Sequence, residues 1–451
     1  MRPPPGPSTR TRLAGIALVA VIAGFYLAQI LSPLRLNTDA YRFLSMAFSV
    51  VEGHGFLVDG KPDVYPEGCP LLLGGLIRLG LGSTLWINAC NILCVLASAL
   101  LFHRLLWLDP AMTPGARLLL AVLPLASWVC VKHATIPLSE NPYLALSYAA
   151  LLALSFAGRA EGWKACGWFA LALVAALAAF RVRTIGLSLV VTTVASAFLH
   201  PEVRAALAGH LPRSQGGRIS AVAAALLLLG AGALFIWQHQ TAKAAQSAAP
   251  AYLLQQKDGA ARGVAALLLF TLNVHTRELG EIFLNLPQSR IPTFPLVFLA
   301  AGGFVLVLGV AGLTRLARRF PPLAIYAVLY TGIILIWPFY DPRFWLPLIP
   351  VLGLGGWLVA ERWWERPAVR WTVQGYAGGF LALGLAALVF STRISLAGSR
   401  FPWRYGDGTT RDSYLVAFDL AAPADAPAAD ERWVRLLRRL EPRAQRAGAP
   451  R

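Results

Sequence analysis

Long apolar runs alternate with short polar segments along most of the chain. An α-helix needs roughly 17 to 22 mostly apolar residues to cross about 30 Å of hydrocarbon. Runs of this length occur near residues 13–31, 83–102, 117–131, 137–156, 165–180, 184–199, 219–237, 294–314, 321–338, 344–360 and 371–391. The pattern predicts an all-α, polytopic integral membrane protein, a helical bundle of about 11 spans.

The charges between these runs predict the orientation of the chain. Loops on the cytoplasmic side of a membrane protein carry an excess of Lys and Arg. With the N-terminus inside, the predicted inner loops carry Arg104, Arg117, Arg159, Lys164, Arg204, Arg213, Arg218, Arg315, Arg318, Arg319, Arg362, Arg366 and Arg370. The short outer loops carry far fewer, so this orientation satisfies the rule.

Two long segments and the tail are expected outside the membrane. Residues 34–82 form the predicted first outer loop, and residues 238–293 form the second. Within the second, residues 263–274 contain only about twelve apolar residues, so we expect an interfacial or re-entrant helix rather than a span. The bundle then covers residues 1–391. A short extracytoplasmic tail, residues 392–451, follows it, although the many arginines of that tail run against the positive-inside rule.

Composition agrees with this membrane assignment. The 451 residues are 57% hydrophobic and 14% charged, unlike an ordinary soluble domain. The net charge of +18 comes mostly from arginines in the short loops and the tail, so we expect no nucleic-acid binding. The five cysteines are not spaced as a disulfide framework. Only Cys69 and Cys130 are predicted near the same side of the membrane. The chain uses Arg far more often than Lys and is rich in Ala, Gly and Pro, a composition that indicates a bacterial protein. We therefore expect it in the bacterial cytoplasmic (inner) membrane.

Residues 36–56, LNTDAYRFLSMAFSVVEGHGF, follow directly on the first span. Over residues 39–52 the apolar positions recur at helical spacing and polar residues fill the remaining arc, with Asn37 or Thr38 as the cap. The pattern predicts an amphipathic helix lying flat on the outer membrane surface. Asp39 then lies at the helix N-terminus, where the carboxylate can act as a base. The alternative is that Asp39 only starts the helix.

The continuation of this stretch carries a family resemblance. After the helix come GHGF and KPDVYPEGCPLLLGGLIRLGL, a Pro-rich turn that leads into a second apolar helix. The layout resembles the first outer loop of the C-type glycosyltransferases that use lipid-phosphate sugars, the protein O-mannosyltransferases and aminoarabinose transferases (glycosyltransferase family 39-like). The matching residues are Asp39, Tyr41, Gly53, Gly55, Phe56, Tyr65, Pro66, Pro70, Leu71 and Leu72. Many members have Asp-Glu where this chain has Asp39-Ala40, so a second carboxylate from elsewhere is expected to complete the site.

Glu140 is the leading candidate for that second carboxylate. Ionisable residues that interrupt apolar sequence near the membrane boundary are energetically costly and therefore suggest function. Glu140, in ATIPLSENPY, opens the fourth predicted span, and the resemblance extends to the Ser139-Glu140 pair. The alternative is a simple Ser/Glu helix start. Lys132 lies in the same short outer turn.

Three further arginines on the predicted outer side suggest an anionic ligand. Arg181 and Arg183 lie between the fifth and sixth spans, where the positive-inside rule predicts no arginine. Arg343 follows Asp341 in WPFYDPRFWLPLIP, and the family often has an Arg-aromatic pair followed by Leu-Pro. Arginine holds phosphate oxygens bidentately, as a polyprenyl-phosphate headgroup would require. The alternatives are arginines that contact lipid headgroups and a purely structural Asp341–Arg343 pair.

The resemblance implies a membrane glycosyltransferase. It would move a sugar from a polyprenyl-phosphate donor to a hydroxyl of a lipid, glycan or protein acceptor on the outer face, with inversion, and Asp39 as general base. The expected site residues are Asp39 and Glu140 for catalysis, Lys132, Arg181, Arg183 and Arg343 for the donor phosphate, and Tyr41, His54, Tyr65 and Asp341 for substrate binding. The alternative is a transporter or flippase of a lipid-linked sugar, with the same charged groups lining a path.

Two further hypotheses concern ligands. A divalent metal ion could find ligands among His54, His239 and His275 together with Asp39 or Glu140. Their spacing in the sequence is not diagnostic of a metal site, so no cofactor is firmly predicted. The tail contains the aromatic residues Trp403, Tyr405 and Tyr414. We expect them either to stack on a sugar or to anchor the tail at the membrane interface.

Overall fold

The computed structural model describes residues 9–199, 264–335, 337 and 339–441, and these are helical almost throughout. The first half of the chain contains α1 (Thr9–Ala28), η1 (Gln29–Leu31), α2 (Thr38–Val51), α3 (Gly68–Arg78), α4 (Thr84–Leu106), α5 (Pro114–Val122), η2 (Leu123–Ala126), α6 (Trp128–His133), α7 (Glu140–Ala157), α8 (Trp163–Val182), η3 (Thr184–Gly186) and α9 (Leu187–Leu199). A two-stranded antiparallel hairpin, β1 (Leu57–Val58) and β2 (Lys61–Pro62), separates α2 from α3.

The second half continues the helical pattern. Its elements are α13 (Val264–Phe283), η4 (Gln288–Arg290), α14 (Pro295–Arg319), α15 (Pro321–Leu335), η5 (Pro342–Leu348), α16 (Ile349–Ala360), η6 (Glu361–Trp363), α17 (Pro367–Ser395), η7 (Gly398–Arg400), α18 (Phe401–Tyr405), α19 (Gly408–Ala417), η8 (Pro423–Asp425) and α20 (Glu431–Leu440).

The predicted all-α, multi-pass architecture is confirmed. Among the described residues, six helices are long and apolar enough to cross a membrane: Leu13–Leu31, Thr84–Leu106, Trp163–Val182, Pro295–Arg319, Pro342–Trp363 and Pro367–Ser395. Shorter apolar helices occur at Gly68–Arg78, Pro114–Ala126, Thr184–Phe198 and Pro321–Leu335. The predicted span at residues 219–237 lies outside the described residues.

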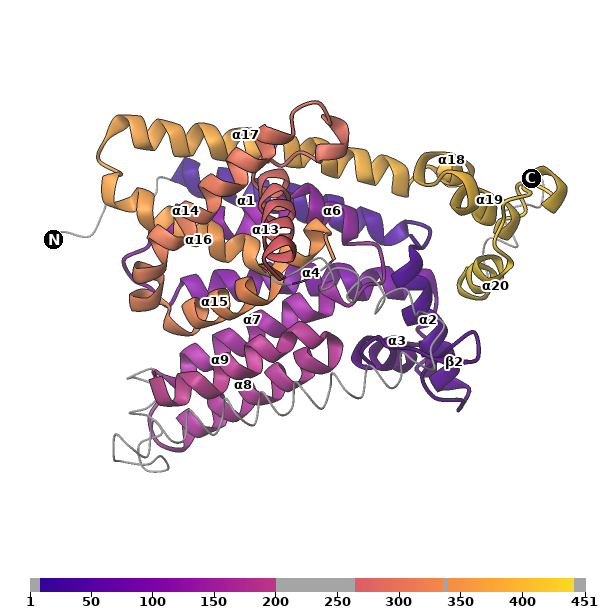
Figure 1. Ribbon diagram of the computed structural model, residues 1–451, viewed down its shortest axis with the longest axis horizontal. Coiled ribbons are helices and arrows are strands. Elements are labelled where there is room, and N and C mark those ends of the chain that lie inside the picture. The colour runs from indigo at the N-terminus through magenta and orange to yellow at the C-terminus, as the bar shows by residue number, and fades with distance from the viewer. Residues whose placement is uncertain (1–8, 200–263, 336, 338, 442–451) are drawn as a thin grey trace.

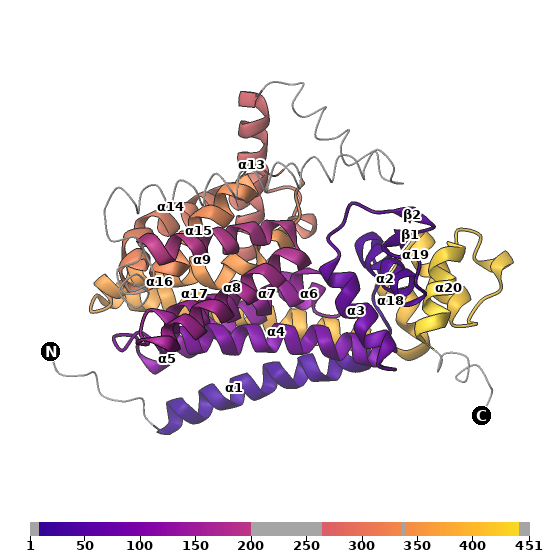
Figure 2. The same ribbon diagram turned by 90° about the horizontal axis from the view of Figure 1, so that it is seen from below.

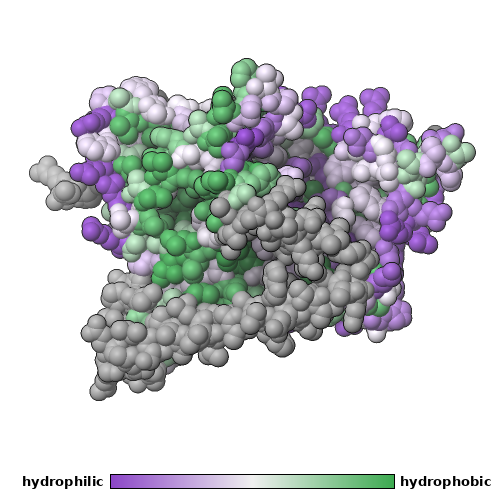
Figure 3. Space-filling view, viewed as in Figure 1, coloured by the Kyte–Doolittle hydropathy of each residue, from purple (hydrophilic) through white to green (hydrophobic). Residues whose placement is uncertain are grey.

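The long helices lie side by side along the long axis of the molecule, and α2, α3, the hairpin and α18–α20 gather at one end (Figures 1 and 2). The face in Figure 3 carries hydrophobic side chains across its middle and hydrophilic ones toward both ends. This distribution is the one expected of a bundle whose midsection faces hydrocarbon. We call the end that holds α2 and α3 the loop end.

Two predicted segments differ from the observed helices. The span expected at residues 117–131 is broken into α5, η2 and α6, because Pro124 interrupts the helix and Ser127 is extended (ψ 131°). The apolar stretch at residues 263–274 continues as α13 to Phe283, which is not one of the span candidates. Figure 2 shows α13 running across the direction of the other helices.

Close packing holds α13 against α14. A Cβ atom at Gly280 would overlap the carbonyl group of Phe298, and one at Gly302 would overlap that of Thr276. Two glycines therefore allow the backbones of α13 and α14 to approach more closely than any side chain would permit.

Helix α2 (Thr38–Val51) lies within one residue of the predicted limits and has a predicted cap, Asn37, but its surroundings differ from the prediction. The side chain of Asn37 accepts a hydrogen bond of 2.8 Å from the amide of Ala40. The apolar stripe, with Leu44 and Ala47 fully buried, packs in one cluster with α3 and the tail helices. The expectation that this stripe rests on the membrane surface is therefore wrong, because other parts of the chain cover it.

The tail is bound to the segment that leaves the first span. The hydroxyl of Tyr414 donates to the carbonyl of Leu34 and accepts from the amide of Leu36, and Tyr405 donates to the carbonyl of Leu36 at 2.8 Å. Tyr414 is fully buried, so sugar stacking by this residue is excluded. The tail thus lies at the loop end of the bundle. Its placement outside the cell stays a prediction.

The cysteines form no disulfide bond in the described part of the chain. All five cysteines are free, including Cys69 and Cys130, both of which are buried. The described helices are therefore held by packing and polar contacts, without a disulfide.

Candidate functional site

Four chain segments bring charged side chains together at the loop end. Asp39 lies in the first turn of α2, Glu140 begins α7, Arg183 follows α8, and Arg343 lies in η5. Each residue is at a helix terminus. Because neighbouring helices of a bundle end at the same level, residues that are far apart in sequence meet there.

Glu140 is the centre of this cluster. Its side chain is only 4% exposed, and its Oε1 atom lies 2.6 Å from Nη1 of Arg183 and 3.2 Å from Nε of Arg343. Two guanidinium groups thus share one carboxylate oxygen. A buried carboxylate needs such partners, because desolvation of an unpaired charge is very costly.

Asp39 extends the cluster toward solvent. Its Oδ2 atom is paired with Nη2 of Arg343, and its Oδ1 atom accepts a hydrogen bond of 2.7 Å from the hydroxyl of Tyr65. Asp341 adds a third carboxylate, 3.1 Å from Nε of Arg343, and its Oδ1 atom also caps η5 by accepting from the Arg343 amide at 3.0 Å. Asp39, with 21% of its side chain exposed, is more accessible than Glu140.

Phe344 lies beside both arginines. The guanidinium carbons of Arg183 and Arg343 are each 5.4 Å from the centroid of its ring. The backbone of Phe344 is held by Tyr330, whose hydroxyl donates to its carbonyl oxygen at 2.7 Å. The aromatic contacts orient the two guanidinium groups and exclude water from one side of them.

The other predicted phosphate ligands lie outside this contact set. Arg181 is 61% exposed and pairs with Glu67 at 2.9 Å. Lys132 lies 5.9 Å from the ring of Trp128. Among the described residues neither side chain forms an ion pair with the Asp39–Glu140 cluster.

The predicted substrate-binding residues fall into two groups. Tyr65 and Asp341 contact the cluster, as described above. Tyr41 instead donates a hydrogen bond of 2.6 Å to Asp59, and His54 is exposed beside Glu52. Tyr41 and His54 line a different pocket on α2.

Burial changes the acid–base behaviour of two nearby groups. Burial, together with the positive charges of Lys132 and Arg343, lowers the pKa of His133 to about 4, although Asp341 opposes the shift. Burial and the hydrogen bond to Asp59 raise the pKa of Tyr41 to about 12. Both groups are therefore neutral at pH 7.

Histidine and carboxylate side chains do not gather as a metal site in the described part of the chain. No group of three or more potential ligands is found there. His275 instead binds Glu278 through Nδ1 at 2.7 Å and the carbonyl of Trp337 through Nε2 at 2.9 Å. His239 lies outside the described residues.

Two carboxylates of this region were not predicted from the sequence, one that supports the cluster and one that pairs with Arg181 outside it. Asp63 accepts 2.7 Å and 3.1 Å hydrogen bonds from Nε of Arg42 and the amide of Tyr65, and so positions the tyrosine that contacts Asp39. Glu67 pairs with Arg181. The available signal was their position in PDVYPEG, on both sides of Tyr65.

A large apolar cavity lies apart from the cluster. It has a volume of about 530 Å³ and is lined by residues of α5, η2, α14, α16 and α17. None of the cluster residues lines it. Its walls are suited to hydrocarbon rather than to a charged group.

Comparisons with known proteins give distant structural neighbours, among them two structures of one protein. No family profile matches the chain, and no curated protein matches it. The crystal structure of ArnT from Cupriavidus metallidurans bound to undecaprenyl phosphate is 14% identical, with a TM-score of 0.44 over 95% of this chain and 77% of that one. The apo structure of the same protein is 15% identical, with a TM-score of 0.43 over 97% of this chain and 78% of that one.

Proposed function

We propose that this protein is a membrane glycosyltransferase that moves a sugar from a polyprenyl-phosphate donor to an acceptor hydroxyl. The reaction would take place at the loop end, on the outer face of the bacterial cytoplasmic membrane. The observation that carries the proposal is the placement of Arg183 and Arg343 on one oxygen of buried Glu140, beside the accessible carboxylate of Asp39. The family resemblance of residues 36–72 agrees with it.

The two arginines are the groups that a donor phosphate would contact. Three carboxylates, Asp39, Glu140 and Asp341, already pair with them, so the phosphate would bind Arg343 in place of one of these carboxylates. A phosphate suits the position because guanidinium groups bind its oxygens with paired hydrogen bonds. Arg181, at the exposed edge, would contact the same headgroup after release from Glu67.

Asp39 would act as the general base after donor binding. In the structure Arg343 occupies Oδ2 of Asp39, an oxygen that would otherwise be open to the acceptor hydroxyl. A donor phosphate that competes for Arg343 would free Asp39. Binding of the donor would thereby activate the base only when the sugar is in place.

The proposed step is a single displacement. The acceptor hydroxyl gives its proton to Asp39 while its oxygen forms a bond to the anomeric carbon. The bond between that carbon and the phosphate oxygen breaks, and its electron pair leaves with the polyprenyl phosphate. Attack from the face opposite the leaving group inverts the anomeric centre. Arg183 and Arg343 would stabilise the charge that develops on the phosphate.

The remaining predicted residues have supporting roles in this proposal. Glu140 would hold the two arginines in place and orient the acceptor. Tyr65 would position Asp39, and Asp341 would position Arg343. Lys132, which lies near His133 in the outer turn, would add long-range attraction for the donor.

The test uses purified protein in sealed liposomes with radiolabelled polyprenyl-phosphate sugars and an acceptor mixture. Native protein should transfer the label to an acceptor, and Asp39→Asn should not. Asp419→Asn is the matched control, because Asp419 pairs with exposed Arg438 at the same end of the molecule. Label that crosses the sealed bilayer while still on its lipid, with no transfer, would instead identify a flippase.

A further inference from the structure

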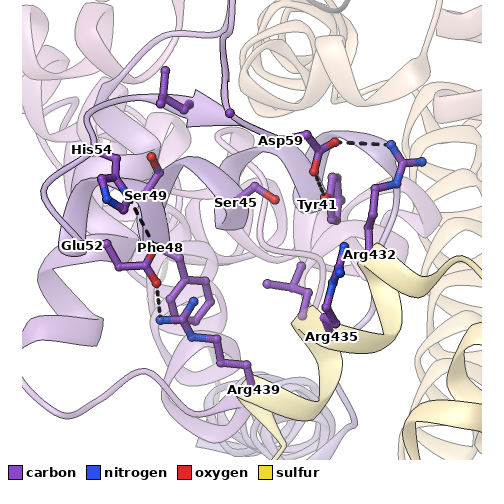
Figure 4. A pocket seen from close by; sticks show the side chains of 13 residues that line it. Tyr41, Ser45, Phe48, Ser49, Glu52, His54, Asp59, Arg432, Arg435 and Arg439 are labelled. Atoms are coloured by element: carbon purple, nitrogen blue, oxygen red, sulfur yellow. Dashed lines mark hydrogen bonds and ion pairs between the residues drawn. The ribbon is translucent and has the colours of Figure 1, made fainter.

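We infer that the pocket between α2 and α20 binds an acidic saccharide unit of the acceptor. The pocket has a volume of about 500 Å³ and lies on the side of α2 that carries Tyr41. Figure 4 shows Arg432, Arg435 and Arg439 of α20 along one wall, with Tyr41 and Ser45 of α2 opposite. The identification of the ligand as the acceptor rests on the proposed function; the chemistry of the pocket does not.

Helical spacing explains why these side chains line one pocket. The α2 wall consists of Tyr41, Ser45, Phe48, Ser49 and Glu52. Each of them lies three or four residues from another member of the set, which places them on one side of the helix. The α20 wall has the same spacing over residues 432–439. Two helix faces that mix polar and apolar residues therefore oppose each other across the pocket.

Two of the three arginines are already neutralised. Arg432 pairs with Asp430 at 2.7 Å and with Asp59 at 3.3 Å. Arg439 pairs with Glu52 at 2.7 Å.

Arg435 differs from both of its neighbours. It lies between Arg432 and Arg439 on α20, and it forms no ion pair or hydrogen bond with any residue in the described ranges 9–199, 264–335 and 339–441. The pocket thus contains one guanidinium group without a carboxylate partner in the described ranges. A ligand with a single phosphate or carboxylate group would pair with it.

The rest of the lining indicates a saccharide rather than a bare anion. The hydroxyls of Ser45 and Ser49 can donate or accept hydrogen bonds, and the carboxylates of Glu52 and Asp59 can accept them from several ligand hydroxyls. A bare anion offers few hydrogen-bond donors to these oxygens. A sugar places many hydroxyl groups at short intervals and carries its charge at one position only, which matches this mixed lining.

The location of the pocket suits an acceptor. Helix α2 carries Asp39 at its N-terminus and the pocket along another face, so one rigid element holds the proposed base and the proposed acceptor site. The hairpin residues Asp59 and Gly60 line the pocket beside the helix. Binding here would hold the acceptor near the start of α2 without occupying the donor site.

The test is a titration of the full-length protein in detergent with glucose 6-phosphate, galacturonate, glucose and inorganic phosphate. Trp433 stacks on Tyr41, with ring centroids 6.4 Å apart. Because the chain has 14 tryptophans, the local signal is the difference in fluorescence between the native protein and Trp433→Phe. We expect the two acidic sugars to bind, and glucose and phosphate to bind at least about tenfold more weakly. Arg435→Gln should weaken the binding of the acidic sugars by about tenfold. Arg404→Gln, a change at an exposed arginine of α18 outside the pocket, should bind as the native protein does.

Two outcomes overturn the inference: Arg435→Gln binds acidic sugars as tightly as the native protein, or glucose binds as tightly as the acidic sugars. Once an acceptor is known, Arg435→Gln should raise its KM while kcat stays near the native value. If transfer proceeds and this KM is unchanged, the acceptor assignment is wrong while the proposed function stands. If acidic sugars bind through Arg435 and no lipid-linked donor is consumed, the proposed function fails and the acceptor assignment fails with it.

Discussion

The two ends of the bundle each contain an arginine bound to several carboxylates, but the two clusters differ in how many cations share those carboxylates. At the end of the bundle opposite the loop end, Arg319 pairs with Asp109 and Glu361. At the loop end, Arg343 pairs with Asp39, Glu140 and Asp341, and Arg183 joins it on Glu140. Burial does not separate them, since Arg319 is 23% exposed and Arg343 is 12% exposed.

The difference lies in how the cations are arranged. Arg319 is one cation between two anions, Asp109 between α4 and α5 and Glu361 of η6, and this arrangement links those two segments. Arg183 and Arg343 are two cations on one oxygen, beside a carboxylate that is partly open to solvent. An arginine–carboxylate cluster is therefore no sign of a site by itself. The paired cations are the informative feature.

The largest expected effect is that of Asp39→Asn. General base catalysis contributes about 10²- to 10⁴-fold, so we expect the transfer rate to fall by about 10³-fold. Donor binding should be retained, because both arginines remain. Single-turnover measurements with radiolabelled donor give the rate. A native rate in the folded variant would show that Asp39 is not the base.

The comparison of the two ends is tested directly by Arg343→Gln and Arg319→Gln. We expect Arg343→Gln to reduce the transfer rate by about 10²-fold, because one of the two guanidinium groups that stabilise the negative charge on the leaving phosphate is lost. Arg319→Gln should instead lower the free energy of unfolding by about 2 kcal/mol and leave the rate of the folded protein near native. Turnover and chemical denaturation in detergent are measured on both variants. Equal losses of activity would remove the distinction between the two ends.

His133 should make the loop end sensitive to pH. Its pKa of about 4 in the folded protein lies below the ordinary value near 6.5, so the unfolded chain binds the proton first. Stability should therefore fall as pH decreases from about 6.5 toward 4, by an amount on the order of 2 kcal/mol between pH 7 and pH 5. His133→Asn should flatten this dependence in denaturation curves. The Arg319 cluster contains only Arg, Asp and Glu and should add little in this range. A variant with the native pH dependence would contradict the assignment.

The smallest expected effect separates Tyr65 from Tyr414. Tyr65→Phe removes the hydrogen bond to Asp39 and should reduce transfer by about fivefold, with little change in stability. Tyr414→Phe removes hydrogen bonds that attach the tail and should cost about 1 kcal/mol of stability with little change in rate. Initial rates and thermal midpoints distinguish the two cases. The opposite pattern would assign Tyr65 to the scaffold.

The sequence predicted helices better than it predicted their surroundings. The limits and cap of α2 follow from Asn37 and from the spacing of its apolar residues, which are local properties. The covering of that apolar stripe by α3 and the tail depends on contacts across the whole chain, so the stripe was wrongly assigned to the membrane surface. For the same reason, Tyr405 and Tyr414 were considered as sugar contacts although they attach the tail to Leu34 and Leu36.

The sequence by itself determined which segments are apolar enough for a membrane and which charged residues lie near their ends. Both properties follow from the order of residues, because hydrocarbon selects long apolar helices and penalises charge within them. Only the tertiary structure decided that Glu140 binds both Arg183 and Arg343 while Lys132 stays outside their contacts. It also placed Tyr41 and His54 in a separate pocket. Helix packing sets the rotation of each helix about its axis, and that rotation decides which residues of a polar helix end meet.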